Sequence, residues 1–106
     1  MKQDKLIVSI YNDYYGAMLT SHQRQMIEKY YDDDMSLSEI GREFGISAQG
    51  VRDTLQRAES SLMNFEEKLG LVAKTERMKK LLLELSPLAS QSQKKEIASV
   101  LTLLDE

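Results

Sequence analysis

The stretch MSLSEIGREFGIS, residues 35–47, decides how this chain is expected to fold. It contains the pattern S-L-S-E, in which the Ser36 hydroxyl accepts a hydrogen bond from the Glu39 amide and the Glu39 carboxylate accepts one from the Ser36 amide. Further along, Gly45 occupies the position at which a helix commonly ends in a left-handed residue. The stretch therefore predicts a short helix over residues 37–44.

A second helix start follows directly at Ser47. Ile46 before it and Val51 after it have the spacing of a hydrophobic staple. From Val51 the apolar positions continue at alternating steps of four and three as far as Leu69, and Gly70 then supplies another terminating residue. A short helix, a three-residue turn and a second, longer helix are the parts of a helix-turn-helix unit.

Gly41 lies in the middle of the first of these helices, although glycine costs about 1 kcal/mol there relative to alanine. We infer that the second helix crosses closely at this point and leaves no room for a side chain. The apolar side chains that share one face of the first helix are expected to be Leu37, Ile40 and Phe44. The second helix is longer than a DNA-reading helix needs, so its distal part must pack on the C-terminal helices, on the first helix of the chain or on a second copy.

The segment before the motif predicts two further helices. Residues 5–18 carry an apolar stripe of Ile7, Tyr11, Tyr14, Tyr15 and Met18. A capping box at Thr20 starts the next helix, which has Met26, Ile27, Tyr30 and Tyr31 on one face and ends at residues 32–34. Tyrosines on such stripes can stack on bases, but packing in a core with their hydroxyls at its edge is favoured. Asp32 to Asp34 form a solvated turn in this interpretation, and His22 is a surface residue.

The C-terminal third predicts two leucine-rich helices. Residues 71–74 are expected to form a short connection, followed by a helix over residues 75–85 and a restart at Ser86 and Pro87. A capping box at Ser90 begins the last helix. These helices are more apolar than so small a domain buries alone, so they predict a homodimer interface, with monomeric packing of six helices as the alternative. We expect one all-α domain over residues 1–106, with a core over 1–70 and an extension over 71–106.

Composition limits the class of protein. The chain has 106 residues, no cysteine, and no apolar run near the ~20 residues that span a bilayer, and no signal-peptide pattern opens it. We therefore expect a cytoplasmic protein without membrane insertion. The net charge is −3, and residues 36–70 hold four basic and six acidic residues. A DNA-binding domain usually carries a basic face, so this balance counts against tight binding of a duplex.

Catalytic signatures are missing from the sequence. The five glycines are isolated, so no phosphate-cradling loop is formed, and no nucleophile elbow, metal triad or Cys-His pair occurs. Asp32 to Asp34 lack the alternating spacing of a calcium loop, and a lone histidine without cysteine does not assemble a usual zinc site. The sequence predicts a protein that is not an enzyme, with no cofactor, no metal and no small-molecule substrate.

Binding chemistry is concentrated at the start of the long helix. In a helix-turn-helix protein the side chains that enter the major groove come from these turns. Gln49 is suited to adenine, Arg52 to bidentate contact with guanine, and Ser47 with the neighbouring amides to a phosphate. Asp53 places a negative charge on the same surface. The predicted nucleic-acid-binding residues, solvent-facing apart from the cap, are Ser47, Ala48, Gln49, Arg52, Asp53, Gln56 and Arg57.

Three segments carry a family resemblance: LTSHQRQMIEKYYDDDMSLSEIGREFGIS, VRDTLQRAESSL and FEEKLGL. They resemble region 4 of bacterial sigma factors and, more closely, the YlxM family of small bacterial helix-turn-helix proteins. The resemblance implies a link to the signal recognition particle pathway and its GTPases. Early in the recognition helix this chain has Ala48, Gln49 and Gly50, where the sigma motif usually has basic or hydroxyl residues.

Two functions follow from the sequence. One is a regulator that binds DNA or RNA through the long helix. The other is a protein-interaction module that docks on signal recognition particle GTPases without reading a DNA sequence. The helix-turn-helix pattern favours the first function, whereas the acidic balance and the resemblance favour the second, and a fold alone does not decide between them.

Overall fold

The structure, a computed structural model, describes residues 4–105, which form helices and short helical turns with no strand. An all-α fold is thereby confirmed. The helices are α1 (Lys5–Tyr15), α2 (Ser21–Ile27), α3 (Leu37–Phe44), α4 (Ala48–Leu69), α5 (Leu71–Leu85) and α6 (Gln91–Leu104). Three short turns join them: η1 (Gly16–Met18), the π-helical η2 (Glu28–Asp32) and η3 (Ser86–Leu88). The chain divides into two compact units, Met1–Gly70 and Leu71–Glu106.

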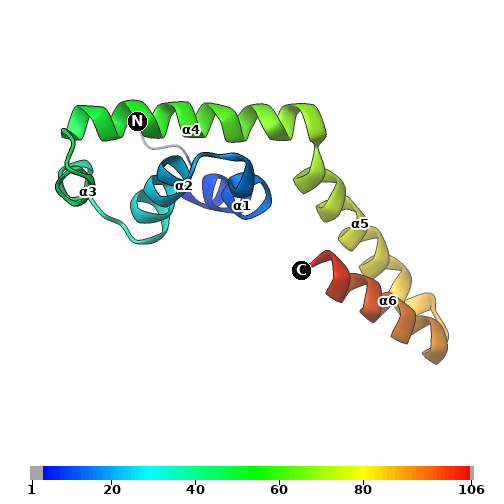
Figure 1. The fold of residues 1–106 in the computed structure, drawn as a ribbon. Coiled ribbons are helices and arrows are strands. Elements are labelled where there is room, and N and C mark those ends of the chain that lie inside the picture. Colours follow the sequence, from blue (N-terminus) through cyan, green and yellow to red (C-terminus); the bar gives the residue numbers. More distant parts are fainter. Residues whose placement is uncertain (1–3, 106) are drawn as a thin grey trace. The chain divides into compact units, whose positions relative to one another are not determined.

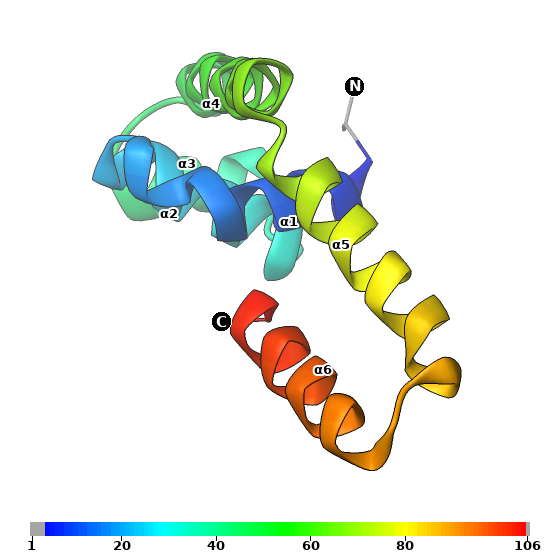
Figure 2. The same cartoon turned by 90° about the vertical axis from the view of Figure 1, so that its right-hand side faces the viewer.

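In the first unit, α1, α2 and α3 lie along one side of α4 (Figures 1 and 2). The buried apolar side chains come from all four helices and η2: Val8, Tyr15, Met26, Ile27, Tyr31, Ile40, Val51, Leu55, Ala58 and Leu62. The distal part of α4 packs on α1, which was one of the three possibilities. The rings of Tyr15 and Phe65 have their centroids 5.8 Å apart, and the Tyr15 hydroxyl donates to Glu66 Oε1 at 2.5 Å.

The helix-turn-helix corner has the predicted caps. The Glu39 amide donates to Ser36 Oγ at 3.1 Å, and the Ser36 amide donates to Glu39 Oε1 at 3.0 Å. Gly45 ends α3 with a φ of 72°, in the left-handed region. Ser47 Oγ then accepts from the Gly50 amide at 3.0 Å and begins α4. Three residues therefore separate a capped short helix from a capped long one.

The turn that follows α3 passes close to Gly41. A Cβ atom built on Gly41 would lie 2.6 Å from the Ile46 carbonyl oxygen and 3.3 Å from the Ser47 carbonyl carbon. The same turn is tied to α3 by the Ile46 amide, which donates to the Gly41 carbonyl at 2.9 Å. The inferred close approach at Gly41 is present. The neighbours are the backbone of the turn and the first backbone nitrogen of α4, that of Ala48 at 3.4 Å, and not a later part of that helix.

The predicted stripe on α1 is right for Tyr15, which is fully buried, but its other members lie beside the buried face. The buried residues are Val8, Asn12 and Tyr15, whereas Ile7 is 43% exposed and Met18 is 52% exposed. The α-helix ends at Tyr15, so Met18 belongs to a separate turn and not to the same face. The interior face is rotated by one residue, and a polar side chain, Asn12, lies inside it.

In the second unit, α5 and α6 lie side by side and run in opposite directions (Figures 1 and 2). The predicted connection over residues 71–74 is wrong, because α5 begins at Leu71. Gly70 alone, with a φ of 62°, separates α4 from α5, and the four residues after it contain no helix breaker. The capping box at Ser90 is present, with its amide donating to Gln93 Oε1 at 2.9 Å. Neither helix contains a buried residue.

Candidate nucleic-acid interface

The surface of the first three turns of α4 forms the candidate interface. The Ser47 cap and the left-handed Gly45 set the direction in which these turns leave the corner. Four of the predicted residues are exposed, namely Ser47, Gln49, Gln56 and Arg57. The other three are partly buried: Ala48, Arg52 and Asp53. The prediction that all the α4 members of this set face the solvent is therefore only partly right.

Two of these residues are engaged with each other. Gln49 Nε2 donates to Asp53 Oδ1 at 3.0 Å, across one turn of α4. Such a pair holds the amide of Gln49 in a fixed orientation and occupies part of the Asp53 carboxylate. A base can form hydrogen bonds with Gln49 in this orientation, or it can displace the hydrogen bond between Gln49 and Asp53.

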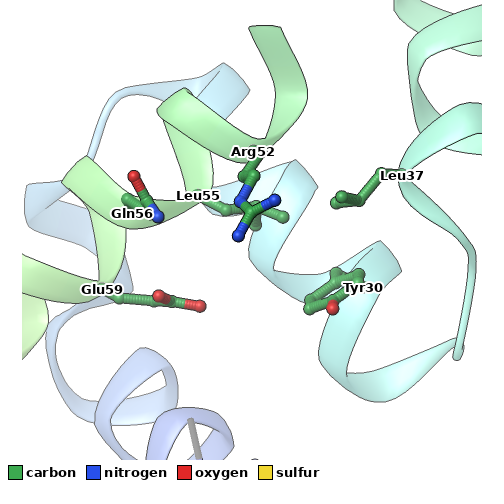
Figure 3. A pocket seen from close by; sticks show the side chains of 6 residues that line it. All are labelled: Tyr30, Leu37, Arg52, Leu55, Gln56 and Glu59. Carbon is green, nitrogen blue, oxygen red and sulfur yellow. The ribbon is translucent and has the colours of Figure 1, made fainter. Parts of the chain in front are cut away.

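Arg52 bends over a cavity of about 100 Å³ beside α4. The cavity is lined by Tyr30 from η2, Leu37 from α3, and Arg52, Leu55, Gln56 and Glu59 from α4. Figure 3 shows the guanidinium of Arg52 and the carboxylate of Glu59 pointing into the same space, with Tyr30 and Leu37 opposite them. The partial burial of Arg52 follows from its place on the flank of α4 that faces α3.

The sequence interpretation missed Glu59 as a buried acid. Its side chain is 9% exposed, and its Oε1 accepts a hydrogen bond from the hydroxyl of Tyr31, which is fully buried. Burial raises the pKa of the Glu59 carboxyl, and the Tyr31 hydroxyl opposes that rise. The available signal was spacing, because Glu59 lies four residues after Leu55 and three before Leu62, on the edge of the buried stripe.

An ion pair at the surface joins α3 to η2. Lys29 Nζ lies 2.9 Å from Glu43 Oε1, and this hydrogen bond raises the pKa of Lys29. At the start of α3, the Ser36 amide and hydroxyl lower the pKa of Glu39. These contacts fix the short helix that supports the corner, so they act on the interface through its geometry.

Residues 4–105 form neither a metal-binding cluster nor a membrane-spanning helix. Among them no cluster of three or more His, Cys, Asp or Glu side chains is placed to hold a metal ion. Within the same range, no helix is both long and apolar enough to cross a membrane.

Exposed aspartates after α2 have partners on α1. Asp32 accepts a hydrogen bond from Ser9 Oγ at 2.8 Å, and Asp34 forms an ion pair with Lys5 Nζ at 3.1 Å.

Known proteins resemble most of this chain. Residues 2–101 match the model of a family described as "Putative helix-turn-helix protein, YlxM / p13 like". The chain is 49% identical over 77 residues to a UPF0122 protein of Desulforamulus reducens, covering 73% of this chain and 66% of the relative. It is 57% identical over 72 residues to a UPF0122 protein of Thermoanaerobacter sp. strain X514, covering 68% and 62%. These two alignments span slightly less than two thirds of the relatives' lengths.

A third relative is aligned along more of its length. The chain is 39% identical over 95 residues to UPF0122 protein YlxM of Bacillus subtilis strain 168. That alignment covers 89% of this chain and 86% of the relative. The similarity therefore extends through the helix-turn-helix unit and into the C-terminal helices.

Proposed function

Since the chain belongs to the family of YlxM/p13-like helix-turn-helix proteins, we propose that it is a non-enzymatic regulator that binds DNA or RNA through the first turns of α4. The observation that supports this most is the capped corner between α3 and α4. It presents Gln49, Gln56 and Arg57 to the solvent at the start of a long helix. Side chains in these turns are the ones with which helix-turn-helix proteins contact base edges.

Each residue has a specific task in this proposal. Arg52 and Arg57 supply the positive charge, and Arg52 also donates to a guanine edge. Gln49 and Gln56 offer amide groups, which pair well with adenine. Asp53 and Glu59 oppose a phosphate backbone nearby, so the affinity is expected to be modest and to fall steeply with salt.

Arg52→Ala is expected to weaken nucleic-acid binding by about 1–3 kcal/mol, because a bidentate donor to a base edge is lost. Fluorescence anisotropy with labelled duplex DNA and hairpin RNA at low and at physiological salt measures this loss. Arg77→Ala is a matched control, since it removes the same side chain from an exposed position on α5 in the second unit. If the wild-type protein forms no complex with either nucleic acid at low salt, the proposal is wrong.

We also propose that a second copy of the chain covers the apolar side chains of α5 and α6. Neither helix has a buried residue, and the exposed apolar side chains include Leu71, Met78, Leu81, Leu83, Leu85, Leu88, Val100 and Leu103. Units below about 40 residues usually need disulfides, metals or oligomerisation to be stable, and this chain has no cysteine. Residues 71–106 hold six basic and five acidic residues, so two copies repel each other little. Two helical hairpins packed together make a four-helix bundle.

The double variant Leu83→Glu/Leu103→Glu is expected to be monomeric where the wild-type protein is dimeric, because it puts four charges into the proposed bundle. Sedimentation equilibrium measures the mass of each protein. Gln91→Glu is the control, since it adds a charge at an exposed position in the first turn of α6. A wild-type protein that sediments as a monomer at micromolar concentrations contradicts the dimer.

A second candidate function is docking on another protein, with signal recognition particle GTPases as the partners that the family resemblance suggests. The observation in its favour is charge. Subtracting residues 71–106 from the whole chain leaves eight basic and twelve acidic residues in 1–70, a net charge of −4. A pull-down with the GTPases, together with the absence of any nucleic-acid complex, would favour this function over the first.

A further inference from the structure

The cavity beside α4 combines apolar walls with polar groups of opposite kinds. Leu37, Leu55 and the ring of Tyr30 form its apolar walls. Arg52, Gln56 and Glu59 provide its polar groups and come from successive turns of α4. The nucleic-acid interface proposed above runs along the same turns, so a ligand bound there meets this cavity.

The three polar side chains differ in what they offer. A guanidinium only donates hydrogen bonds, an ionised carboxylate only accepts them, and a primary amide does both. Glu59 is nine-tenths buried, and the described structure gives its Oε1 one donor, the Tyr31 hydroxyl. A carboxylate has about four acceptor positions, so Glu59 has capacity for donors from a ligand in the cavity.

The opposite charges of Arg52 and Glu59 make simple ions less favourable ligands than they would be beside either charge alone. A phosphate placed against Arg52 would be repelled by the buried Glu59 carboxylate. A metal ion or an ammonium group placed against Glu59 would be attracted by its carboxylate but repelled by the Arg52 guanidinium, which points into the same space, so the net attraction is reduced (Figure 3). The ligand that fits is neutral and planar, with donors on one part of its edge and an acceptor on another.

We propose that the cavity receives the Watson–Crick edge of an unpaired guanine in an RNA loop. This inference rests on the proposed function and specifies its ligand. The N1–H and N2–H groups of guanine donate to Glu59, O6 accepts from Arg52, and Tyr30 with the two leucines packs against the base plane. The cavity is smaller than the ~150 Å³ that hold a benzene molecule, so it takes the edge of the base and leaves the ribose outside.

Base pairing decides which nucleic acids can use the cavity. In a duplex the Watson–Crick edge of guanine is already hydrogen-bonded to cytosine. Sequence-specific RNA recognition commonly uses unpaired loop bases, which expose this edge and stack on aromatic side chains. The cavity therefore selects looped guanine over paired guanine.

The test uses one RNA hairpin whose loop carries a single guanine, inosine or adenine, and a fully paired duplex of the same stem. We expect binding by the full chain to weaken about tenfold from guanine to adenine, with inosine between them because it lacks the N2 amine. Glu59→Gln is expected to remove most of the preference for guanine over adenine. Because it also removes a negative charge that opposes a phosphate backbone, it is expected to strengthen duplex binding, so the ratio of the affinities for the guanine and adenine loops is the measure. Glu67→Gln, at an exposed carboxylate on α4, is the matched control.

A second measurement needs no variant. Dicarbonyl reagents add to N1 and N2 of unpaired guanine, so the wild-type protein is expected to protect the loop guanine from them. Equal binding of the three loops without protection overturns the guanine site, and the proposed function then stands on duplex or other RNA binding alone. Absence of any complex, with RNA or duplex DNA, overturns both.

Discussion

Tyr31→Ala is expected to lower the free energy of unfolding by about 3–5 kcal/mol, as removal of a large buried aromatic side chain does. The side chain is fully buried, and its ring centroid lies 5.1 Å from that of Tyr30 in an edge-to-face arrangement. Its hydroxyl donates to Glu59, so the alanine variant leaves both a cavity and a buried carboxylate without this donor. Urea unfolding followed by circular dichroism measures the loss.

Two further variants separate the ring from the hydroxyl. Tyr31→Phe keeps the packing and is expected to cost about 1–3 kcal/mol, the usual penalty when a buried acceptor loses its partner. Adding Glu59→Leu to Tyr31→Phe removes the acceptor as well, and part of the stability is expected to return. A Tyr31→Phe variant as stable as the wild type would show that the hydrogen bond to Glu59 contributes nothing.

The same pair gives stability a pH signature. Burial raises the pKa of Glu59 above its ordinary value of 4.5, so the unfolded chain ionises at lower pH than the folded one. The stabilising contribution of the neutral carboxyl is complete below pH 4.5 and is lost as the pH rises through the folded pKa. Glu59→Gln is therefore expected to flatten the decline in stability above that pH. An unchanged slope in this variant would assign the decline to other groups.

Local signals explain why the corner was predictable from sequence. A capping box, a terminating glycine and a second cap each constrain the backbone within a few residues, and their spacing in residues 36–47 leaves one arrangement. Ser36, Gly45 and Ser47 occupy the predicted positions. The buried stripe of α4 from Val51 to Leu62 also follows its heptad spacing.

Features set by tertiary contacts were less predictable. On α1, the tyrosine-rich stripe and the buried face differ by one residue, because the packing against α4 and η2 selects Val8, Asn12 and Tyr15. Tyr15 lies on the buried face and Tyr11 and Tyr14 lie beside it, so the spacing of the tyrosines alone does not show which face is buried. Arg52 was expected to face the solvent but is partly buried beside Leu37 and Tyr30. The sequence did not indicate this, because the positions of those two side chains depend on how α3 and η2 pack.

Ile40→Ala is expected to lower the free energy of unfolding by about 2–5 kcal/mol, because it removes a fully buried aliphatic side chain from α3. The other two apolar side chains of this face, Leu37 and Phe44, are only partly buried. Ile40 is therefore the main apolar anchor of a helix of eight residues, too short to be stable in isolation. Urea unfolding of the variant measures the effect.

Ile46→Ala is the matched control, since the same truncation is made at a side chain in the turn that is 43% exposed. It is expected to cost about 1 kcal/mol or less, as substitutions near the surface usually do. If Ile46→Ala costs as much as Ile40→Ala, the turn contributes as much to the corner as the buried side chain of α3 does, and Ile40 is not its main anchor. If Ile40→Ala has little effect, α3 is not held by its buried face, and the direction in which α4 leaves the corner has another cause.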